Sequence, residues 1–560
     1  MPFLGLGKTL FNSSVCYFED YSNVEILLTE RLQRKKASGS WPSQALLNLS
    51  ERYDLSDLSI NENRDVEDPA QIESVMNSRF PFFEYLKSNN LDKFSRHFNN
   101  KINFTTHHLA HAYAASFMSP FEKSLILVID GAGSKANAFS DTHPEYSHIN
   151  FNTDSAEERS LYFFESGKIK LADKKMQIFK KSEIHPEHFF SEGLGTFYEK
   201  ASEYVFNSKR SAGKVMGLAA LGSPQKILDS KKYLEDMDWS LRYQGASKKE
   251  WEKSPHFKKY CNISADVQNY FEVDYLGYIK SIKERYPTYQ NLIITGGCAL
   301  NCTSNMKLIN LKLFENIYIP PFPGDECIGL GTAFMSYIKA ENSWELNSYE
   351  KQNGYFGAKT SQPTEAEIIR LFSDYEITKP ASIAMFTAKI LADGHIVGWF
   401  QGRSESGPRS LGNRSLLCRP DKQGIKNYLN TDIKFRESFR PYGCSTLFDK
   451  SHLYFDVSEN FNNPYMSFAT KVRPEFSSLL NEVSHIDGTS RMQTVRRGQN
   501  TLFYELIECF GKITNLYVLL NTSLNIMGEP IIETLTDAKN FLDSVPVYGL
   551  AAGDFFIRRK

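Results

Sequence analysis

The chain has 560 residues, and its 65 Lys and Arg balance 66 Asp and Glu, for a net charge of −1. This length exceeds a single hydrophobic core and predicts two to four domains. The even balance gives no general basic face, so we expect neither nucleic acid nor membrane as a partner. No apolar run approaches the roughly 18 residues that span a bilayer. The start, MPFLGLGKTLFNSS, lacks the basic segment of a secretion signal, and eight scattered cysteines suit reduced thiols, so we expect a cytoplasmic protein.

The first half of the chain alternates predicted strands with helices. Residues 3–20 resemble a strand that turns and returns, and residues 26–28 continue as a strand before a basic segment. SLILVID (124–130) predicts a buried strand that ends in Asp130, and LIITGG (292–297) predicts another that ends in a Gly-Gly turn. Strands that deliver a carboxylate or glycines into a turn are typical of ligand sites in open α/β sheets.

The second half predicts another strand-and-helix system. GLGTAFMSYI (329–338) indicates a helix, and residues 340–380 lose the apolar pattern and resemble a linker. From about residue 384 to the end the α/β pattern resumes, with a strand entered within 391–402 and a buried one at 516–520. We see no internal repeat.

Three of the twelve histidines fall within HHLAH (107–111). His107 and His111 are four residues apart and would share one face of a helix. Such a pair is either half of a metal site or two buried, hydrogen-bonded imidazoles, and the residues leave the two readings about equal. Asp130 and Asp325 would complete a mixed N/O set suited to Fe(II), Mn(II) or Zn(II), although each alone is more typical of a turn or helix cap. His108 is more typical of a supporting partner.

Glycine-rich turns recur at DGAGS (130–134), GKVMGLAALG (213–222) and TGGCALN (295–301). Backbone amides in such turns can hold phosphate oxygens, and Lys214 could add a charge. None is a Walker or GxGxxG motif, and each glycine can equally be a steric requirement.

The strongest signal is a cationic stretch broken by Gly, Pro and Asn. Residues 403–440 hold nine cations but only four acidic residues, Glu405, Asp421, Asp432 and Glu437; the cations that we single out are Arg403, Arg409, Arg414, Arg419, Lys434, Arg436 and Arg440. Guanidinium forks suit phosphate and carboxylate, so the stretch favours an anion pocket over a solvated face. Further donors follow in DGTSRMQTV and LLNTSLNIMGEPI: Arg491, Asn521, Thr522, Ser523 and Asn525.

These motifs resemble, in order and along the whole chain, those of the ATP-dependent O-carbamoyltransferases, the family of tobramycin-, cephamycin- and nodulation-factor-carbamoylating enzymes. HHLAHA, VIDGAG, GKVMGLA, GGCALN and PPFPGDE match the N-terminal motifs; ESGPRSLGNRS, IKFRESFRPYG, DGTSRMQTV and NTSLNIMGEP match the C-terminal ones. The resemblance implies an α/β protein with an actin/Hsp70-like (ASKHA) domain related to threonylcarbamoyl-transferase over residues 1–355, a linker at 356–380, and a YrdC-like domain over 381–560.

The resemblance also implies a two-step reaction. The C-terminal domain would use carbamoyl phosphate with ATP and Mg²⁺ to make carbamoyl-adenylate and pyrophosphate, and the N-terminal metal site would pass the carbamoyl group to a hydroxyl of a small molecule or sugar. The implied metal ligands, for Fe²⁺ or another divalent transition metal, are His107, His111, Asp130 and Asp325. The implied catalytic residues are Arg409, Lys434, Arg440, Arg491, Ser523 and, by proximity only, His108. The nucleotide-binding residues would be Lys214, Gly296, Gly297, Asn301, Arg414, Asn521 and Asn525. A homodimer is left open.

The chain departs from the family at its first strand turn. Phe11 and Asn12 stand where the family usually has His and Asp, and that His is associated with activating the acceptor. Two alternatives therefore stay open. One keeps adenylation with an unusual acceptor, an amine or a macromolecule; the other is a degenerate, nucleotide-binding regulatory protein.

Overall fold

The computed structural model describes residues 2–9, 12–53, 59–64, 102–134, 155–245, 247–346, 353–359 and 363–560. Phe11, which stands at the position expected to activate the acceptor, lies outside these residues. The chain divides into two compact units: residues 1–196, 288–298 and 314–347 form the first, and residues 197–287, 299–313 and 348–560 the second. Among the described residues, no helix has the length and apolar character needed to cross a membrane.

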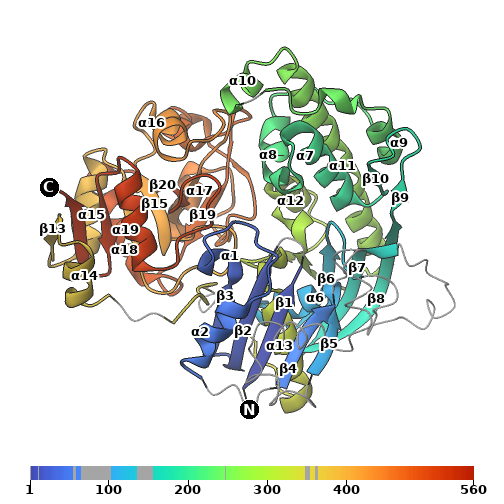
Figure 1. Ribbon diagram of the computed structural model, residues 1–560, viewed down its shortest axis with the longest axis horizontal. Helices are drawn as coiled ribbons and strands as arrows, with labels where there is room; N and C mark the ends of the chain where they lie inside the picture. Colours follow the sequence, from blue (N-terminus) through green and yellow to red (C-terminus); the bar gives the residue numbers. More distant parts are fainter. Residues whose placement is uncertain are drawn as a thin grey trace. The chain divides into compact units, whose positions relative to one another are not determined.

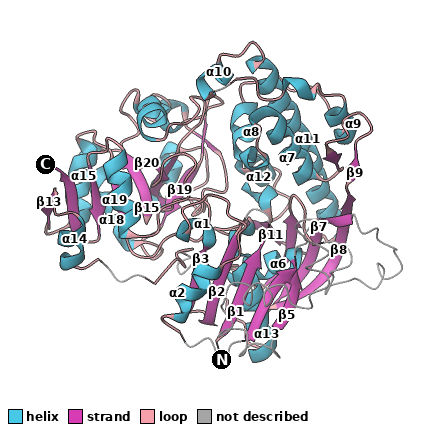
Figure 2. Cartoon of the chain, in the orientation of Figure 1, coloured by secondary structure: helices cyan, strands magenta, loops and turns pink. Residues whose placement is uncertain are grey.

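The first unit contains two five-stranded sheets, whose strands can be followed in Figures 1 and 2. One has the order β3-β2-β1-β4-β5, with β1 Phe3–Lys8, β2 Ser13–Asp20, β3 Asn23–Leu28, β4 Ser59–Arg64 and β5 Ile102–Thr106. The other has the order β12-β11-β6-β7-β8, with β6 Lys123–Ile129, β7 Ser155–Glu165, β8 Lys168–Ile178, β11 Asn291–Thr295 and β12 Asn316–Tyr318. The predicted strands at 3–20, 124–130 and 292–297 are confirmed.

The two sheets have the same topology. In each, the first three strands form an antiparallel meander, and the last two run parallel to the first. This duplication agrees with the actin/Hsp70-like fold. The sequence showed no repeat, because topology is duplicated here without readable identity between the halves.

A helix follows the last strand of each sheet: α6 (His107–Phe117) follows β5, and α13 (Ile328–Glu341) follows β12 after the short helix η6 (Asp325–Cys327). The two helices pack against each other, α13 lying on β1 and β2 and α6 on β6 and β11. Small residues permit this contact, because a Cβ at Gly331 would lie 1.8 Å from the carbonyl oxygen of Ala110. The first turns of both helices therefore meet near the strand ends.

The remaining elements of the first unit are short. They are α1 Thr29–Leu32, α2 Ser43–Ser50, β9 Lys180–Lys181 and β10 Phe189–Phe190. The helical part of the second unit comprises α7 Leu194–Phe206, which begins in the first unit, α8 Ala212–Ala219, α9 Ser230–Glu235, α10 Lys248–Glu252, α11 Phe257–Arg285 and α12 Cys302–Asn310.

The C-terminal part of the second unit is built on an eight-stranded sheet in the order β13-β22-β21-β14-β15-β20-β16-β19. Its strands are β13 Tyr375–Thr378, β14 Val397–Phe400, β15 Arg414–Cys418, β16 Gly443–Leu447, β19 Met492–Val495, β20 Val518–Ser523, β21 Gly549–Ala552 and β22 Phe555–Arg559. The helices are α14 Glu365–Leu371, α15 Ile383–Ala392, α16 Ile425–Tyr428, α17 Ser451–Tyr454, α18 Thr501–Thr514 and α19 Leu535–Ser544; β17 Thr470–Lys471 pairs with β18 Thr489–Ser490.

Both faces of this sheet are covered, as its continuous apolar strands require. Successive residues of β15 show this: Leu416 belongs to the core beneath α19, and Leu417 to the core beneath α15 and α18. The predicted strands within 391–402 and near 516–520 correspond to β14 and β20. Within 340–380, where we expected a linker, the structure has α14 and the edge strand β13, which pairs with β22. One short helix and one four-residue edge strand carry too weak an apolar pattern to be recognised.

Candidate functional site

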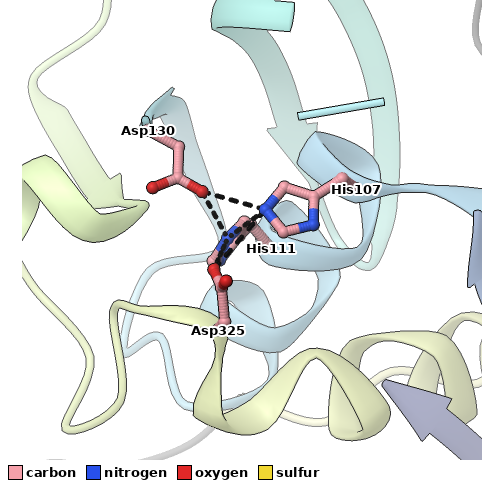
Figure 3. A group of neighbouring side chains, drawn as sticks. All are labelled: His107, His111, Asp130 and Asp325. Atoms are coloured by element: carbon pink, nitrogen blue, oxygen red, sulfur yellow. Dashed lines mark hydrogen bonds and ion pairs between the residues drawn. The ribbon is translucent and has the colours of Figure 1, made fainter. Parts of the chain in front are cut away.

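Four side chains from three segments of the first unit converge (Figure 3). His107 and His111 lie on the first turns of α6, so their rings face the same side, as the spacing predicted. Asp130 follows directly after β6, and Asp325 opens η6. The predicted set His107, His111, Asp130 and Asp325 is thus brought together, and its ligand atoms all lie within 4.8 Å of one another.

The distances fit a metal ion. Nε2 of His107 lies 3.1 Å from Nε2 of His111, 2.9 Å from Oδ2 of Asp130 and 3.5 Å from Oδ1 of Asp325. Nε2 of His111 lies 3.5 Å and 3.4 Å from the same two oxygens. Metal–ligand bonds of about 2.0–2.2 Å would place neighbouring ligand atoms roughly 3.0 Å apart in octahedral and roughly 3.4 Å apart in tetrahedral geometry. The residues present therefore fit a divalent ion with a mixed N/O shell.

Electrostatics favour the same reading. Burial raises the pKa of Asp130, but hydrogen bonds and charge from His107 and His111 outweigh it, so the net pKa lies well below the usual range. Asp325 behaves alike: burial and the Asp130 charge raise its pKa, the two histidines lower it, and the result is about 2. Burial lowers the pKa of His111, yet its contacts with both carboxylates raise it overall. Two ionised carboxylates beside the imidazoles thus favour a positive charge between them, and a metal ion would supply it.

His108 points elsewhere in the first unit. Its Nδ1 lies 2.8 Å from Oγ of Ser160, and its backbone N–H donates to Oε2 of Glu157. Burial, the first cause, and neighbouring cations lower its pKa well below 6.5, so it is neutral. Glu157 is itself buried and pairs with Lys174 at 2.6 Å. His108 therefore anchors the start of α6, and its predicted catalytic part stays a prediction.

A second candidate site lies in the C-terminal part of the second unit. Lys434 is 3% exposed. Its ammonium donates to the backbone oxygens of Ser523 and Asn525 and to Oδ1 of Asn525, while Oγ of Ser523 also donates to that Oδ1. The predicted residues Lys434, Ser523 and Asn525 are thus in contact, although the ammonium bonds to carbonyl-type oxygens and to no carboxylate within these contacts.

Three arginines of the C-terminal part of the second unit lie close enough for their charges to interact: Arg436, Arg440 and Arg491, hereafter the arginine cluster. Their charges act on one another, since Arg440 and Arg491 both lower the pKa of Arg436, after burial, to about 10. Burial, and after it Arg440, lowers the pKa of Arg491 too. Among the described residues, the cluster has one carboxylate within ion-pair distance, Glu437, 3.6 Å from Arg440. Uncompensated, partly buried positive charge of this kind favours binding of an anion.

Comparisons with known proteins show the family to which the chain belongs. Residues 70–334 match the model of the carbamoyltransferase N-terminus, and residues 388–559 that of the carbamoyltransferase C-terminus. The nodulation protein NolO of Bradyrhizobium diazoefficiens is 31% identical over 471 residues, which cover 81% of this chain and 79% of that protein. The chain belongs to the carbamoyltransferase family. It is accordingly an enzyme of the transferase class.

For other relatives of this carbamoyltransferase, the match covers a smaller share of this chain or of the relative. Nodulation protein NolNO of Sinorhizobium fredii is 31% identical, and the match spans 82% of this chain but 64% of that longer protein. The 3'-hydroxymethylcephem-O-carbamoyltransferase of Streptomyces clavuligerus is 31% identical over 62% of this chain and 65% of that enzyme. Among solved structures, HypF in a phosphate- and nucleotide-bound form is 13% identical, with a TM-score of 0.33 over 61% of this chain and 56% of HypF.

Several other predicted residues of the carbamoyltransferase have structural partners. Arg414 is fully buried, and its guanidinium donates to the backbone oxygens of Gln401, Gly402 and Asn413 while stacking on Phe400. These contacts give it a structural role and lend no support to nucleotide binding. Similarly, Arg419 pairs with Asp421 at 2.6 Å and does not extend the arginine cluster.

Lys214 and Asn521 are also engaged. Nζ of Lys214 lies 2.7 Å from Oε1 of Glu437, so it is paired with the carboxylate that also faces Arg440. The amide of Asn521 donates to Ser410 and Ser445 inside the sheet. Arg409 lies in the loop between β14 and β15. The parts predicted for these three residues in binding stay predictions.

Gly296, Gly297 and Asn301 of the GGCALN turn have different structural roles. Gly296 has φ +89°, and a Cβ there would lie 2.2 Å from the carbonyl oxygen of Ile129, so glycine is required by the close approach to β6. The N–H of Gly297 donates to Oδ1 of Asp130 at 2.9 Å and so supports a metal ligand. Asn301 caps α12 and exchanges hydrogen bonds with Gln268. None of these contacts addresses nucleotide binding, which stays a prediction for all three.

A cavity of about 260 Å³ within the second unit was not foreseen. Met216, Ala265 and Cys302 give it apolar walls, Gln268 and Glu272 give it polar groups, and Arg491 lines it as well. The sequence also missed Thr9, whose hydroxyl donates to Oδ2 of Asp325 at 2.8 Å. No local signal marks such residues, because 316 positions separate Thr9 from Asp325 and only the fold joins them.

Proposed function

We propose that this protein is an ATP-dependent carbamoyltransferase that works in two steps. The first step makes carbamoyl-adenylate from carbamoyl phosphate and ATP, using the C-terminal residues. The second passes the carbamoyl group to a hydroxyl of a small molecule or sugar at the site of His107, His111, Asp130 and Asp325. We retain residues 1–355 and 381–560 as the two functional parts of this proposal; residues 356–380 join them and contribute α14 and β13 to the C-terminal part. The relative named 3'-hydroxymethylcephem-O-carbamoyltransferase supports a hydroxyl acceptor.

The observation that carries the first step is the arginine cluster. Two polyanions must approach each other, and their phosphate charges would repel without cations. Arg436, Arg440 and Arg491 supply three charges against one carboxylate within ion-pair distance among the described residues. Atom balance requires one water: it takes the phosphoryl group of carbamoyl phosphate, and the freed carbamate oxygen then attacks the α-phosphorus of ATP and displaces pyrophosphate. Phosphate and pyrophosphate are both released.

The cavity lined by Arg491 has the features that an adenylate would need. Met216, Ala265 and Cys302 offer an apolar wall for a purine, and Glu272 and Gln268 could accept from and donate to ribose hydroxyls. The guanidinium of Arg491 would then face the phosphate. This cavity therefore supports the use of a nucleotide, and we assign the adenylate to it. Residues 216–302 would then bind the nucleoside, and Arg491 of the C-terminal part its phosphate.

The second step uses the mixed ligand set of the first unit. The donor set suits Fe(II), and also Mn(II) or Zn(II), each of which, when bound, lowers the pKa of a coordinated hydroxyl and polarises a carbonyl. His107 and His111 orient one side of this site, and Asp130 and Asp325 fix the other while remaining ionised. Gly297 and Thr9 hold the outer carboxylate oxygens in place.

The proposal is tested by following the carbamoyl group. Purified protein is incubated with ATP, Mg²⁺, Fe²⁺ under anaerobic conditions and carbamoyl phosphate labelled in its carbon, together with a panel of hydroxyl and amine acceptors. We expect label in a hydroxyl-bearing product only when ATP is present. Label transferred without ATP, or only to amines, would contradict the proposal; no transfer and no AMP release would favour the regulatory alternative.

A further inference from the structure

Thr9 is placed at the metal site by the fold rather than by sequence. It follows β1, the first strand of its sheet, just as Asp130 follows β6, the first strand of the topologically equivalent sheet. Thr9 is 2% exposed. Its Oγ1 lies 2.8 Å from Oδ2 of Asp325. The equivalent positions of the two sheets therefore contribute one direct ligand candidate and one hydroxyl that contacts a ligand.

The direction of the Thr9 hydroxyl follows from its partners. Oγ1 accepts a hydrogen bond from the backbone N–H of Asn12 at 3.1 Å. Among the described residues, its one proton can go to Asp325 at 2.8 Å or to the carbonyl oxygen of Asn12 at 3.2 Å. That carbonyl already accepts from the backbone N–H of Thr9 at 2.8 Å. The shorter, charge-assisted bond to the ionised Asp325 is the stronger of the two.

The two carboxylates are therefore held in the same way. Oδ1 of Asp325 faces the imidazoles of His107 and His111, while its Oδ2 is bound by Thr9. In Asp130 the oxygen Oδ2 faces the imidazoles, while Oδ1 is bound by the N–H of Gly297. Each carboxylate thus offers one oxygen to the centre and has the other occupied by a donor.

We propose that Thr9 is a positioning residue that keeps Asp325 a one-oxygen ligand, so that a coordination position stays open for the acceptor or the carbamoyl oxygen. Chelation by both oxygens of Asp325 would require Oδ2 to leave the Thr9 hydroxyl. Asp325 would then fill a position that a substrate oxygen needs. This inference rests on the metal centre of the proposed function, and it adds a role for Thr9 in that centre.

Cobalt(II) binding tests the inference, because the visible absorption of Co²⁺ reports its coordination number without any turnover. The proteins compared are wild type, Thr9→Val, which keeps the shape but loses the donor, and Thr9→Ser, which keeps the donor. The matched control is Thr29→Val, since Thr29 is an equally buried threonine whose hydroxyl lies 2.6 Å from that of Ser13. Affinity is measured by competition with a chelator, and folding is checked by circular dichroism.

We expect Thr9→Val to bind Co²⁺ about 10- to 100-fold more weakly, the usual loss when an outer partner of a ligand is removed, with a weaker visible band from added coordination. Thr9→Ser and Thr29→Val should stay within about threefold of wild type. Wild-type affinity and spectrum in Thr9→Val would overturn the inference. If Thr9→Val does not fold, Thr9→Ala is judged by the same criteria.

The outcome is separable from that of the proposed function. Suppose that wild type transfers carbamoyl groups and Thr9→Val binds Co²⁺ normally. That result would contradict the role of Thr9 and still support the proposed function. Conversely, wild type could transfer no carbamoyl group while Thr9→Val alone binds Co²⁺ weakly. That result would support the role of Thr9 and contradict the proposed function. Wild-type protein that binds no Co²⁺ would overturn the inference at its root.

Discussion

Replacing Arg491 with methionine should remove the repulsion between its guanidinium and those of Arg436 and Arg440 in the ligand-free protein. It should also remove the stabilisation of the protein by bound anions. Nε of Arg491 is buried, and no hydrogen bond or carboxylate partner is found for it among the described residues. The cost of crowding is visible in Arg436, whose pKa falls to about 10, first through burial and then through Arg440 and Arg491. That change corresponds to about 3 kcal/mol in all. Since burial is the larger cause, we assign roughly 1 kcal/mol or less to Arg491.

Thermal unfolding with and without pyrophosphate measures both effects. Wild type should be stabilised by about 2.7 kcal/mol at a concentration of 100 times Kd, or roughly 5 to 10 °C for a domain of this size. Arg491→Met should unfold at the wild-type temperature or slightly higher without ligand, and should lose most of the pyrophosphate response. Lys471→Met, at an exposed cation on β17, is the matched control and should keep that response.

The opposite pattern would contradict a role of Arg491 in anion binding. If Arg491→Met lost more than about 2 kcal/mol of stability without ligand and kept the full pyrophosphate response, Arg491 would be a structural residue. The arginine cluster would then be no anion site, and the first step of the proposed reaction would lose its main support.

Three further predictions concern single residues. His111→Ala should abolish tight 1:1 binding of Co²⁺, measured by chelator competition, because it removes one nitrogen of a four-ligand set; unchanged stoichiometry would place the metal elsewhere. Lys434→Met should cost about 3 kcal/mol in urea unfolding, since three buried oxygens lose a charged donor, whereas a cost under about 1 kcal/mol would show that the ammonium is not part of the fold. His108 has a lowered pKa in the folded protein, so the unfolded state binds the extra proton, and stability should fall as pH drops below about 6.5, by about 1.4 kcal/mol per pH unit. His108→Gln should remove that slope in pH-dependent unfolding, and an equal slope in both proteins would contradict the neutral histidine.

The four candidate metal ligands could be named from the sequence because local patterns and the resemblance to a family indicated the same residues. His107 and His111 are one helical turn apart, and Asp130 ends an apolar strand. The arginine-rich stretch was equally visible, but its members could not be sorted. Arg414 proved to bind backbone oxygens inside the fold, while Arg436 joined the cluster. Whether a guanidinium faces a carbonyl or a cavity depends on tertiary contacts that no local pattern encodes.

The duplicated topology of the first unit also escaped the sequence. Strand order and direction are repeated between the two sheets, yet the equivalent positions after β1 and β6 are occupied by Thr9 and Asp130, which share no chemistry that a search for repeats could detect. Likewise, the edge strand β13 owes its place to pairing with β22, nearly 180 residues later. Contacts between distant segments are the part of the fold that periodicity cannot supply.

The most direct test of the account is exchange of labelled pyrophosphate into ATP. It is measured in wild type, His111→Ala and Arg440→Ala, each with and without carbamoyl phosphate. We predict exchange in wild type only when carbamoyl phosphate is present, because the adenylate must form before pyrophosphate can reverse the reaction. His111→Ala should keep this exchange within about twofold, and Arg440→Ala should lose it. Exchange that does not depend on carbamoyl phosphate, or that disappears with His111 while surviving without Arg440, would contradict the assignment of the two steps to two sites.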